Sequence, residues 1–585
     1  MQLVRRFRLP ALLCSLAVLF CELVSRPHTD MGICDDGTYI RSAHRLAVTG
    51  HILYNGVETP MLGLQLYLGA ALVKLFGFSL TTVRMSTLLV AVAMAWLLQR
   101  TMALAGINER NATLGTLAFV LSPLYLMLSV TYMTDIFGLF AVVICLYGCL
   151  RALQASTDRA TLAWLCFAVA TNAVFGTARQ IAWLGILVMV PSALYVLSRR
   201  GAWRSREKVL FAGGAATAAG ALFIFACMQW FARQPYSVPE HLSLRGGLAL
   251  NLLASFFHAA LEFPFLLLPV VILFVPELRK DLRRSVRVAA AFFGICVLIL
   301  LVLHLARAQD RPVLEPTMRD WVTIYGGFAG TWIAGDPPIF LHDGIRAVLT
   351  LASLGGLIGL TALLLSPRPI PRGAEGAQPL PWRELGILLG PFAVVYTLLL
   401  VPRSASAVVL ASNLYDRYLL ELLAVALPCI VRCYQERVRA RLPPAAVLMV
   451  WVTAVYSIVV VHNMFSFYRA RVLLAAEIRA SGVPDTSVDN GWEYNFAVEL
   501  RHSNHINDPR IEVPANAYTP IPRAPGGLCA TKIEDRTPHV RPLFRVSFEP
   551  NGCYGPAPFA PVHYSRWLAA PGALYVVRFL PTARE

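Results

Sequence analysis

Residues 111–153 read NATLGTLAFVLSPLYLMLSVTYMTDIFGLFAVVICLYGCLRAL. The stretch contains two apolar runs, 111–131 and 137–153, which are separated by a short polar turn at Thr134 and Asp135. A helical run of about 20 apolar residues matches the hydrocarbon core of a bilayer. The backbone must satisfy its own hydrogen bonds in lipid, and the lack of strict alternation favours helices over barrel strands. The stretch therefore predicts two membrane-spanning helices joined by a tight turn.

Similar apolar runs recur over most of the chain. Of its 585 residues, 57% are hydrophobic and 15% are charged, whereas soluble domains average roughly 45–50% apolar and about 25% charged residues. About thirteen spans are predicted, at 9–24, 82–104, 111–131, 137–153, 160–177, 181–198, 208–232, 249–275, 288–306, 344–366, 384–401, 416–432 and 444–464. The sequence thus predicts an all-α polytopic membrane domain over residues 1–464.

Basic residues between the runs predict the orientation of the chain. The start, MQLVRRFR, and the clusters 199–208, 279–287, 368–383 and 432–441 fall on one side if the spans alternate. The positive-inside rule places that side in the cytoplasm. The formal net charge of +17 resides mainly in these clusters rather than in a basic patch on a soluble domain, so no nucleic-acid partner is expected.

The first run is predicted to be an uncleaved helix with a cytoplasmic N-terminus. A signal peptide is the alternative, but Cys21 and Glu22 make a poor small-residue cleavage site. Pro60–Gly77 is also apolar enough to span, yet it carries Gln65 and Lys74. If it crossed the membrane, every later basic cluster would lie outside. We therefore expect a juxtamembrane or re-entrant helix within a first outer loop, 26–82.

Residues 465–585 are expected to form a small α+β domain on the outer side. RVSFEP and ALYVVRFLP predict strands, and Cys529 and Cys553 are disulfide candidates if that side is oxidising. Trp492, in DNGWEYN, fits either an acceptor contact or a structural turn. Trp321 and Trp332, in the preceding outer loop, are expected to be interfacial anchors rather than platforms for a sugar ring.

Acidic residues at the outer boundary are the first candidates for chemistry, because charges there are costly and are often functional. Asp35 and Asp36 precede Gly37 and a short predicted helix, Thr38–Val48, with Gly50 as its stop. Capping of that helix would explain one carboxylate, whereas two exceed what a cap needs. One could act as a general base toward an acceptor hydroxyl. Asp135 is likewise a catalytic candidate, with an N-cap as its alternative.

Arginines on the same side are the second group of candidates. Arg84, Arg179 and Arg417 lie at predicted outer ends of spans. Long basic side chains at such positions often serve as snorkelling anchors, but the positive-inside bias makes outer arginines less expected. A guanidinium fork suits a phosphate, so a lipid-linked phosphate is the expected ligand.

These segments together resemble a family of bacterial membrane glycosyltransferases. The matching stretches are DDGTYIRSAHRLAVTGHILYNG (35–56), TDIFGLF (134–140), TARQIAWLG (177–185) and YDRYLLELLAVAL (415–427). They are similar to GT-C fold enzymes of glycosyltransferase family 39, the protein O-mannosyltransferase-like group related to the lipid A aminoarabinose transferase. The resemblance runs from about Leu9 to His462, and no single motif in it is specific.

The resemblance implies transfer of a sugar from a polyprenyl-phosphate donor, with inversion, on the periplasmic side of a bacterial inner membrane. It implies an acidic base at Asp35 with Asp36 beside it, and a second acidic residue at Asp135. The counterparts it implies for donor and phosphate binding are Arg84, Arg179, Gln180, Arg417 and Tyr39. Many relatives have Asp-Glu where this chain has Asp-Asp, so the resemblance does not decide which carboxylate is the base.

Three questions stay open at this point. A divalent metal such as Mg or Mn at the acidic pair is an alternative to a metal-free site. The acceptor is a glycan, a lipid or a protein. A transporter or flippase of lipid-linked or small substrates is the alternative function, although no internal repeat is present and the charges gather at one face. An inactive scaffold with the same fold is a third hypothesis.

Overall fold

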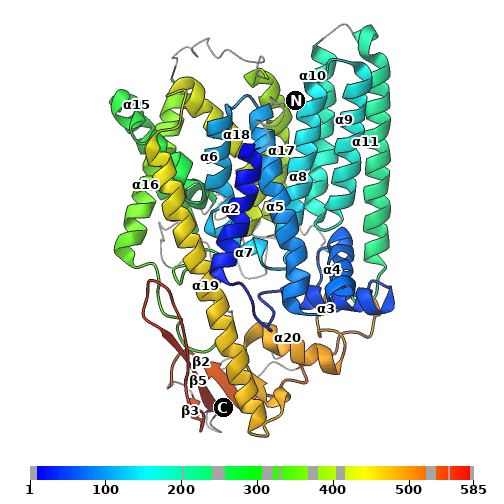
Figure 1. Ribbon diagram of the computed structural model, residues 1–585, viewed down its shortest axis with the longest axis vertical. Coiled ribbons are helices and arrows are strands. Elements are labelled where there is room, and N and C mark those ends of the chain that lie inside the picture. The colour runs from blue at the N-terminus through cyan, green and yellow to red at the C-terminus, as the bar shows by residue number, and fades with distance from the viewer. Residues whose placement is uncertain are drawn as a thin grey trace.

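The computed structural model describes residues 9–200, 203–239, 257, 259–305, 320–328, 333–366, 380–403, 415–521, 535–550 and 554–579. Figure 1 shows a bundle of long helices. The N-terminal end of the described chain lies at one end of this bundle. A short helix, α20 (Gly491–His502), and a small sheet lie beyond the other end (Figure 1).

Ten helical segments of the described chain are long and apolar enough to cross a membrane. They are α5 (Leu80–Leu104), α8 (Asp135–Leu153), α9 (Asp158–Gly176), η1 to α10 (Gln180–Arg199), α11 (Trp203–Ala232), α15 (Leu282–Leu305), α16 (Asp343–Leu364), α17 (Trp382–Arg403), η4 and α18 (Asp416–Arg437) and α19 (Pro444–Ala480). Two of these combine helix types: η1 (Gln180–Trp183), η2 (Gly185–Met189) and α10 (Val190–Arg199), and η4 (Asp416–Leu419) followed by α18 (Leu420–Arg437). The predicted multi-pass α-helical architecture is confirmed.

Two further predicted spans are broken helices rather than straight ones. Run 111–131 forms α6 (Glu109–Val120) and α7 (Pro123–Ser129), which are bent by 68°. Ser122 caps α7 by accepting the Tyr125 N–H at 3.4 Å, and Pro123 occupies the first helical position. The second pair, Ala259–Leu266 and Leu268–Lys280, is bent by 77°. Its second half contains α13 (Leu268–Val271), η3 (Ile272–Phe274) and α14 (Glu277–Lys280).

The total agrees with the predicted number of spans. Counting each bent pair once gives up to 12 spans among the described residues. The first predicted span is α2 (Leu9–Ser25), a helix of 17 residues that is just shorter than the others. The sequence prediction was about thirteen, with α2 as the first span.

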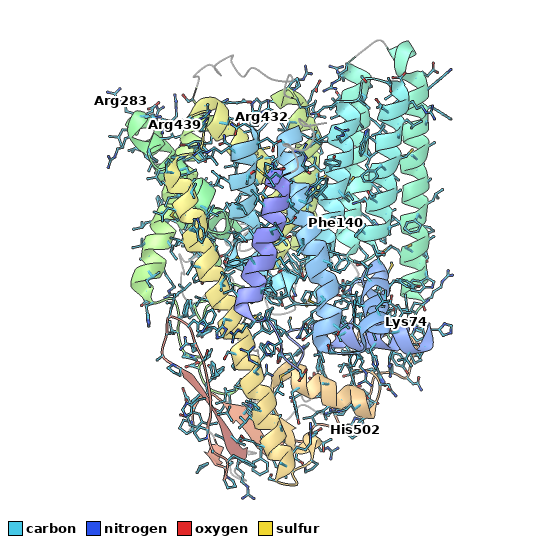
Figure 2. All side chains as sticks on the ribbon, in the orientation of Figure 1. Lys74, Phe140, Arg283, Arg432, Arg439 and His502 are labelled. Atoms are coloured by element: carbon cyan, nitrogen blue, oxygen red, sulfur yellow. The ribbon has the colours of Figure 1, made fainter. Side chains whose placement is uncertain are left out.

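Charged residues mark the two ends of the bundle. Figure 2 shows Arg283, Arg432 and Arg439 at the end where the described chain begins, and Lys74 and His502 toward the other end. Two of the basic clusters that the sequence assigned to one side, 279–287 and 432–441, therefore have residues at the same end of the bundle.

The loop between α2 and α5 holds two helices that lie at the end opposite to these arginines (Figure 1). The predicted helix is α3 (Asp36–Thr49), and Gly50 ends it with a φ of 76°. Pro60–Gly77 contains α4 (Gly63–Phe76), which has only 14 residues. Gln65 ties α4 to the turn before α8, because its Nε2 donates to Tyr132 O at 2.8 Å and its own carbonyl accepts from Tyr132 Oη at 2.5 Å.

The C-terminal region begins as a continuation of the last span. The predicted boundary at 464/465 falls inside α19, whose 37 residues extend well past the length that a bilayer needs. Strand pairing gives the order β1-β2-β5-β3, with β4 also on β5; β1 and β2 are parallel and the other pairs are antiparallel. The elements are η5 (Asp485–Ser487), β1 (Val488–Asp489), β2 (Phe544–Ser547), β3 (Tyr554–Pro556), β4 (Val562–Tyr564) and β5 (Gly572–Phe579).

Both strands predicted from RVSFEP and ALYVVRFLP are present, as β2 and β5. They pair with each other, with Val546 opposite Val576. The two cysteines of the predicted disulfide, Cys529 and Cys553, lie outside the described residues.

Candidate functional site

A cavity of about 410 Å³ lies where the helix bundle meets the C-terminal region. Several distant segments reach it: the loop after α2, the turns before α8 and η1, the start of η4, the loop at 320–328 and the C-terminal region. Its polar and aromatic lining residues are Cys34, Asp35, Tyr39, Thr59, Thr134, Asp135, Arg179, Gln180, Asp320, Phe328, Tyr415, Arg417, Tyr418, Trp492, Phe496, Asp508, Arg510 and Arg536. Six of the predicted site residues are among them.

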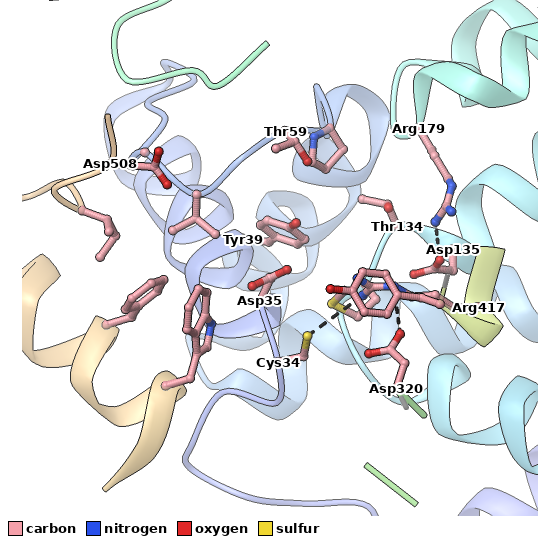
Figure 3. Close-up of a pocket in the computed structure, with 18 of the residues that line it drawn as sticks. Cys34, Asp35, Tyr39, Thr59, Thr134, Asp135, Arg179, Asp320, Arg417 and Asp508 are labelled. Atoms are coloured by element: carbon pink, nitrogen blue, oxygen red, sulfur yellow. Dashed lines mark hydrogen bonds and ion pairs between the residues drawn. The ribbon is translucent and has the colours of Figure 1, made fainter. Parts of the chain in front are cut away.

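Asp35 lines the cavity from the loop before α3. It precedes α3, but its side chain makes no capping hydrogen bond, so capping does not explain it. Figure 3 shows its carboxylate and the Arg417 side chain pointing toward one another across the cavity. Burial raises the pKa of Asp35, while Arg417 and a hydrogen bond from Trp492 oppose that rise. Among the described residues, no guanidinium or ammonium lies within ion-pair distance of this carboxylate.

Asp36 faces away from the cavity and is bonded to Arg84. The Arg84 Nε–Asp36 Oδ2 distance is 2.8 Å, and both side chains are buried. Asp36 also accepts the backbone N–H groups of Ile33 at 2.6 Å and Tyr132 at 3.2 Å. Consecutive residues on a helix point in directions about 100° apart, which separates the two carboxylates. The structure therefore does not bring Asp36 and Arg84 to the site with the other predicted residues.

Two glycines allow the loop after α2 to lie against the first turn of α3. A Cβ on Gly37 would lie 2.9 Å from the Cα of Gly32, and one on Gly32 would lie 2.8 Å from the Cα of Gly37. This backbone contact contains no side chain that could move aside. It brings Ile33 N–H within reach of Asp36, and so fixes the backbone on both sides of Asp35.

Replacement of Gly37 by Ala is expected to destabilise the protein by about 1–3 kcal/mol, the usual range for overpacking. Equilibrium unfolding in mixed detergent micelles measures the change. The matched control is Gly390→Ala in α17, where an added Cβ meets nothing within 4 Å and alanine is the better helix former. A Gly37→Ala protein as stable as the wild type would show that the close approach is dispensable.

Arg179 lies between two carboxylates at the base of the cavity. It forms an ion pair with Asp135, and its Nε lies 3.5 Å from Glu421 Oε1. Its guanidinium carbon is 5.1 Å from the centre of the Tyr418 ring. Asp135 Oδ2 and Arg179 Nη2 are buried and make no hydrogen bond with the described residues. A buried polar atom without a hydrogen bond lowers the stability of the folded protein. A polar ligand bound in the cavity would supply hydrogen bonds to both atoms.

Three residues near the Arg179–Asp135 ion pair, Thr134, Gln180 and Tyr39, lie in segments that the sequence singled out. Thr134 precedes α8 without a side-chain capping bond, so the N-cap alternative does not explain the Thr134-Asp135 turn either. Gln180 lines the cavity and donates from Nε2 to Thr59 O at 3.3 Å. Tyr39 is buried and lines the cavity one turn along α3 from Asp35.

Arg417 lines the cavity from the start of η4, and Figure 3 shows its side chain beside Cys34 and Asp320. Its Nε lies 3.2 Å from Asp320 Oδ2, and its guanidinium carbon lies 5.0 Å from the centre of the Tyr415 ring. Its Nη1 is 4.0 Å from the sulfur of Cys34, the residue next to Asp35. These contacts hold the planar guanidinium of Arg417 at the cavity that Asp35 also lines.

Asp416 fixes the loop that carries Asp320. Its carboxylate accepts the backbone N–H groups of Trp321 at 3.0 Å and Val322 at 2.6 Å. Trp321 is fully buried and stacks on Phe328, with the ring centres 5.2 Å apart. The expectation of an interfacial anchor at Trp321 is therefore wrong, because the loop folds inward onto Asp416. Trp332 lies outside the described residues.

The C-terminal region closes the other side of the cavity. Trp492 and Phe496 of α20 line it, as do Asp508, Arg510 and Arg536. Asp508 Oδ2 lies 2.8 Å from Arg510 Nη2, so this pair is already neutralised. Sequence reasoning had left Trp492 undecided, and it missed Asp320, Asp508 and Arg510 because they stand in polar segments without a periodic pattern.

A buried network joins α20 to the loop that holds Asp35. Glu493 accepts the backbone N–H of Cys34 at 3.3 Å and the hydroxyl of Tyr468 at 2.5 Å. Its other oxygen lies 3.0 Å from Arg471 Nη2, and both side chains are fully buried. The C-terminal region is thereby attached to the residue next to Asp35.

The acidic pair does not fit a divalent cation. Asp36 is already bonded to Arg84 and two backbone N–H groups, and Asp35 points into the cavity instead. Within the described ranges, no three His, Cys, Asp or Glu side chains are grouped so that they could hold a metal ion.

No protein-family model matches the chain, and no curated protein matches its sequence. Among solved structures, it is similar to ArnT from Cupriavidus metallidurans in the apo state, at 16% identity over 84% of each chain and a TM-score of 0.38. ArnT from the same organism bound to undecaprenyl phosphate matches at 14% identity over 98% of each chain, with a TM-score of 0.39.

The archaeal oligosaccharyltransferase AglB from Archaeoglobus fulgidus, in complex with an inhibitory peptide and a dolichol-phosphate, is also similar. It matches at 14% identity over 80% of this chain and 58% of that chain, with a TM-score of 0.37. These neighbours are GT-C fold glycosyltransferases, the group that the sequence resembles. TM-scores below 0.5 describe a distant likeness that does not by itself define an activity.

Proposed function

We propose that the protein is a glycosyltransferase that moves a sugar from a polyprenyl-phosphate-linked donor to an acceptor hydroxyl, with Asp35 as the general base. One observation carries the proposal. Asp35 has no ion-pair partner among the described residues, and it shares a cavity with the guanidinium groups of Arg179 and Arg417. A base and cations in one cavity are what displacement of a phosphate by a hydroxyl requires.

In the proposed reaction, the acceptor hydroxyl gives its proton to Asp35 while its oxygen bonds to the anomeric carbon. The bond from that carbon to the phosphate oxygen breaks, and the electron pair leaves with the polyprenyl phosphate. Arg417 and Arg179 would stabilise the charge that develops there. Attack opposite to the leaving group inverts the anomeric centre. Asp135 would hold Arg179 in place, and Gln180 and Tyr39 would shape the donor site.

The proposed location is the outer face of a bacterial inner membrane. Arg283, Arg432 and Arg439 lie at the opposite end of the bundle from α20 and α3 (Figures 1 and 2). The positive-inside rule would place those arginines in the cytoplasm, and the cavity would then open toward the periplasm. A transporter is less well supported, because transporter sites lie near the bilayer midplane, whereas this cavity lies beside α20.

The test is sugar transfer in proteoliposomes, with a panel of polyprenyl-phosphate-linked sugars as donors and release of polyprenyl phosphate as the readout. Because burial raises the pKa of Asp35 from 3.8, and the base must be ionised, kcat/KM should rise with pH through a value above 3.8. In Arg417→Gln, loss of the neighbouring cation should move that rise to higher pH and slow transfer by about 10²-fold or more.

Lys74→Gln is the matched control. Lys74 is exposed on α4, outside the cavity, and its replacement also removes one positive charge. It should leave both the rate and the pH profile unchanged. If release of polyprenyl phosphate proceeds equally in Arg417→Gln and wild type, the proposed role of the cavity is wrong.

A further inference from the structure

A second cavity, of about 680 Å³, lies beside the first and is not used by the proposed mechanism. It is bounded by α3, by the end of α19 and by α20. Three residues, Cys34, Trp492 and Phe496, line both cavities. The two spaces are therefore separated by a partition that is in places only one side chain thick, and Asp35 follows one of its members in the chain.

The second cavity carries an excess of positive charge. Arg41 and Arg45 lie one turn apart on the same face of α3, and Arg479 and Arg501 face them from α19 and α20. Arg479 and Arg501 share a single carboxylate, Asp485. Neither Arg41 nor Arg45 has a carboxylate partner among the described residues.

Arg41 has a buried donor that makes no hydrogen bond with the described residues. Its Nη2 donates to Leu500 O at 2.5 Å, but its Nε is buried without a hydrogen-bond partner in the described structure. Burial and the nearby charges of Arg45 and Arg501 lower its pKa. A guanidinium held among like charges, with a buried N–H left over, is stabilised by an anion.

The acidic residues of the cavity do not neutralise this group. Glu493 is already bonded to Arg471 and Tyr468. Asp30 is the other carboxylate that lines the cavity, and it forms no ion pair with the four arginines. The cluster thus keeps a net positive charge.

One wall of the cavity is apolar and adjoins the membrane-spanning part. Phe78 is 46% exposed and stacks on His44, with the ring centres 3.9 Å apart. Leu80, which also lines the cavity, is the first residue of the span α5. An anion bound to Arg41 and Arg45 would therefore have an apolar surface at the membrane boundary within the same cavity.

We propose that this cavity binds the acceptor, and that the acceptor carries a phosphate group which Arg41 and Arg45 hold while a separate hydroxyl passes Trp492 to reach Asp35. This inference rests on the proposed transferase function. The phosphate belongs either to a lipid headgroup or to a soluble glycan, and the apolar wall at Phe78 favours the lipid.

The test measures binding to the purified full-length protein in neutral detergent by isothermal titration calorimetry. Dioctanoyl phosphatidic acid is the lipid phosphate, sn-glycerol 3-phosphate is the soluble phosphate, and dioctanoylglycerol is the uncharged lipid. Phosphatidic acid should bind, and Arg41→Gln/Arg45→Gln should weaken its binding at least about tenfold through loss of charge-assisted hydrogen bonds. Dioctanoylglycerol should bind at least about tenfold more weakly than phosphatidic acid.

Arg439→Gln/Arg441→Gln is the matched control, because it removes the same charge at the other end of the bundle and should leave binding unchanged. Arg45→Gln alone keeps the bond from Arg41 to Leu500, and it should still weaken binding several-fold if the double variant folds poorly. Equally tight, arginine-dependent binding of glycerol phosphate would support the site and assign it to a soluble phosphate. Equal binding of phosphatidic acid to wild type and both cavity variants would overturn the proposal.

The binding experiment tests the phosphate site separately from the proposed transferase activity. Asp35→Asn should bind phosphatidic acid as the wild type does, since Asp35 does not line this cavity. Arginine-dependent binding together with no sugar transfer would reject the enzyme and keep the anion site. Transfer without arginine-dependent binding would keep the enzyme and reject the anion site.

Discussion

Asp35→Asn is expected to lower kcat by about two to four orders of magnitude, the usual contribution of a general base. Asparagine keeps the size and polarity of the side chain but cannot accept the acceptor's proton. Asp35 is the carboxylate of the cavity that has no ion-pair partner among the described residues, whereas Asp135, Asp320 and Asp508 each lie beside an arginine. Its loss should therefore remove the proton acceptor without leaving a buried cation unpaired.

The measurement is the initial rate of transfer in proteoliposomes, with protein amount and unfolding midpoint matched to the wild type. Asp336→Asn is the control: Asp336 is exposed, lies outside the cavity and loses the same charge. The unfolding free energy of Asp35→Asn should stay equal to or slightly above that of the wild type, because a buried carboxylate is replaced by a neutral group. Full activity in Asp35→Asn would remove the proposed base.

Hydropathy predicts most of the fold, because span length and backbone satisfaction in lipid are strong constraints on a helical membrane protein. The bend between α6 and α7 had a signal in the sequence, since Ser122 followed by Pro123 is a typical helix start. Whether the 60–77 segment crosses the membrane was harder to predict from the sequence. What the sequence could not show is that Gln65 and Tyr132 exchange two hydrogen bonds, a contact over 67 residues that attaches α4 to the turn before α8.

The site was only partly predictable, because it too depends on contacts between residues that are far apart in the sequence. Asp135, Arg179 and Arg417 stand at the ends of apolar runs, where a charge is conspicuous, and Asp35 belongs to an adjacent acidic pair before a predicted helix. Asp508 and Arg510 lie in a polar stretch where charges are common, so nothing in the local pattern distinguishes them. Their position depends on α20, which is attached to the Asp35 loop by buried bonds of Glu493 across more than 450 residues.

Asp35 and Asp36 show most clearly what the sequence alone cannot predict, because these adjacent carboxylates have different surroundings in the structure. Asp35 and Asp36 are chemically identical in the sequence, and the resemblance to known glycosyltransferases did not separate them. The partner that separates them is Arg84, 48 residues away. Because α3 starts at this point, one residue is turned into the cavity and the next into the protein.

Asp36→Asn is therefore expected to act on stability, with a loss of about 3–5 kcal/mol, the range for breaking a buried ion pair. Arg84 is 3% exposed, and the neutral amide would leave its charge buried without compensation. Equilibrium unfolding in mixed detergent micelles measures the loss.

The double variant Asp36→Leu/Arg84→Met provides the control, because it removes both charges together. It should regain part of the stability, since an apolar pair avoids the unpaired charge. The recovery should be incomplete, because the N–H groups of Ile33 and Tyr132 lose their acceptor. A protein that is fully stable as Asp36→Asn but has lost transfer would reverse the assignment: Asp36 would then act in the reaction itself, and the ion pair with Arg84 would have to open for catalysis.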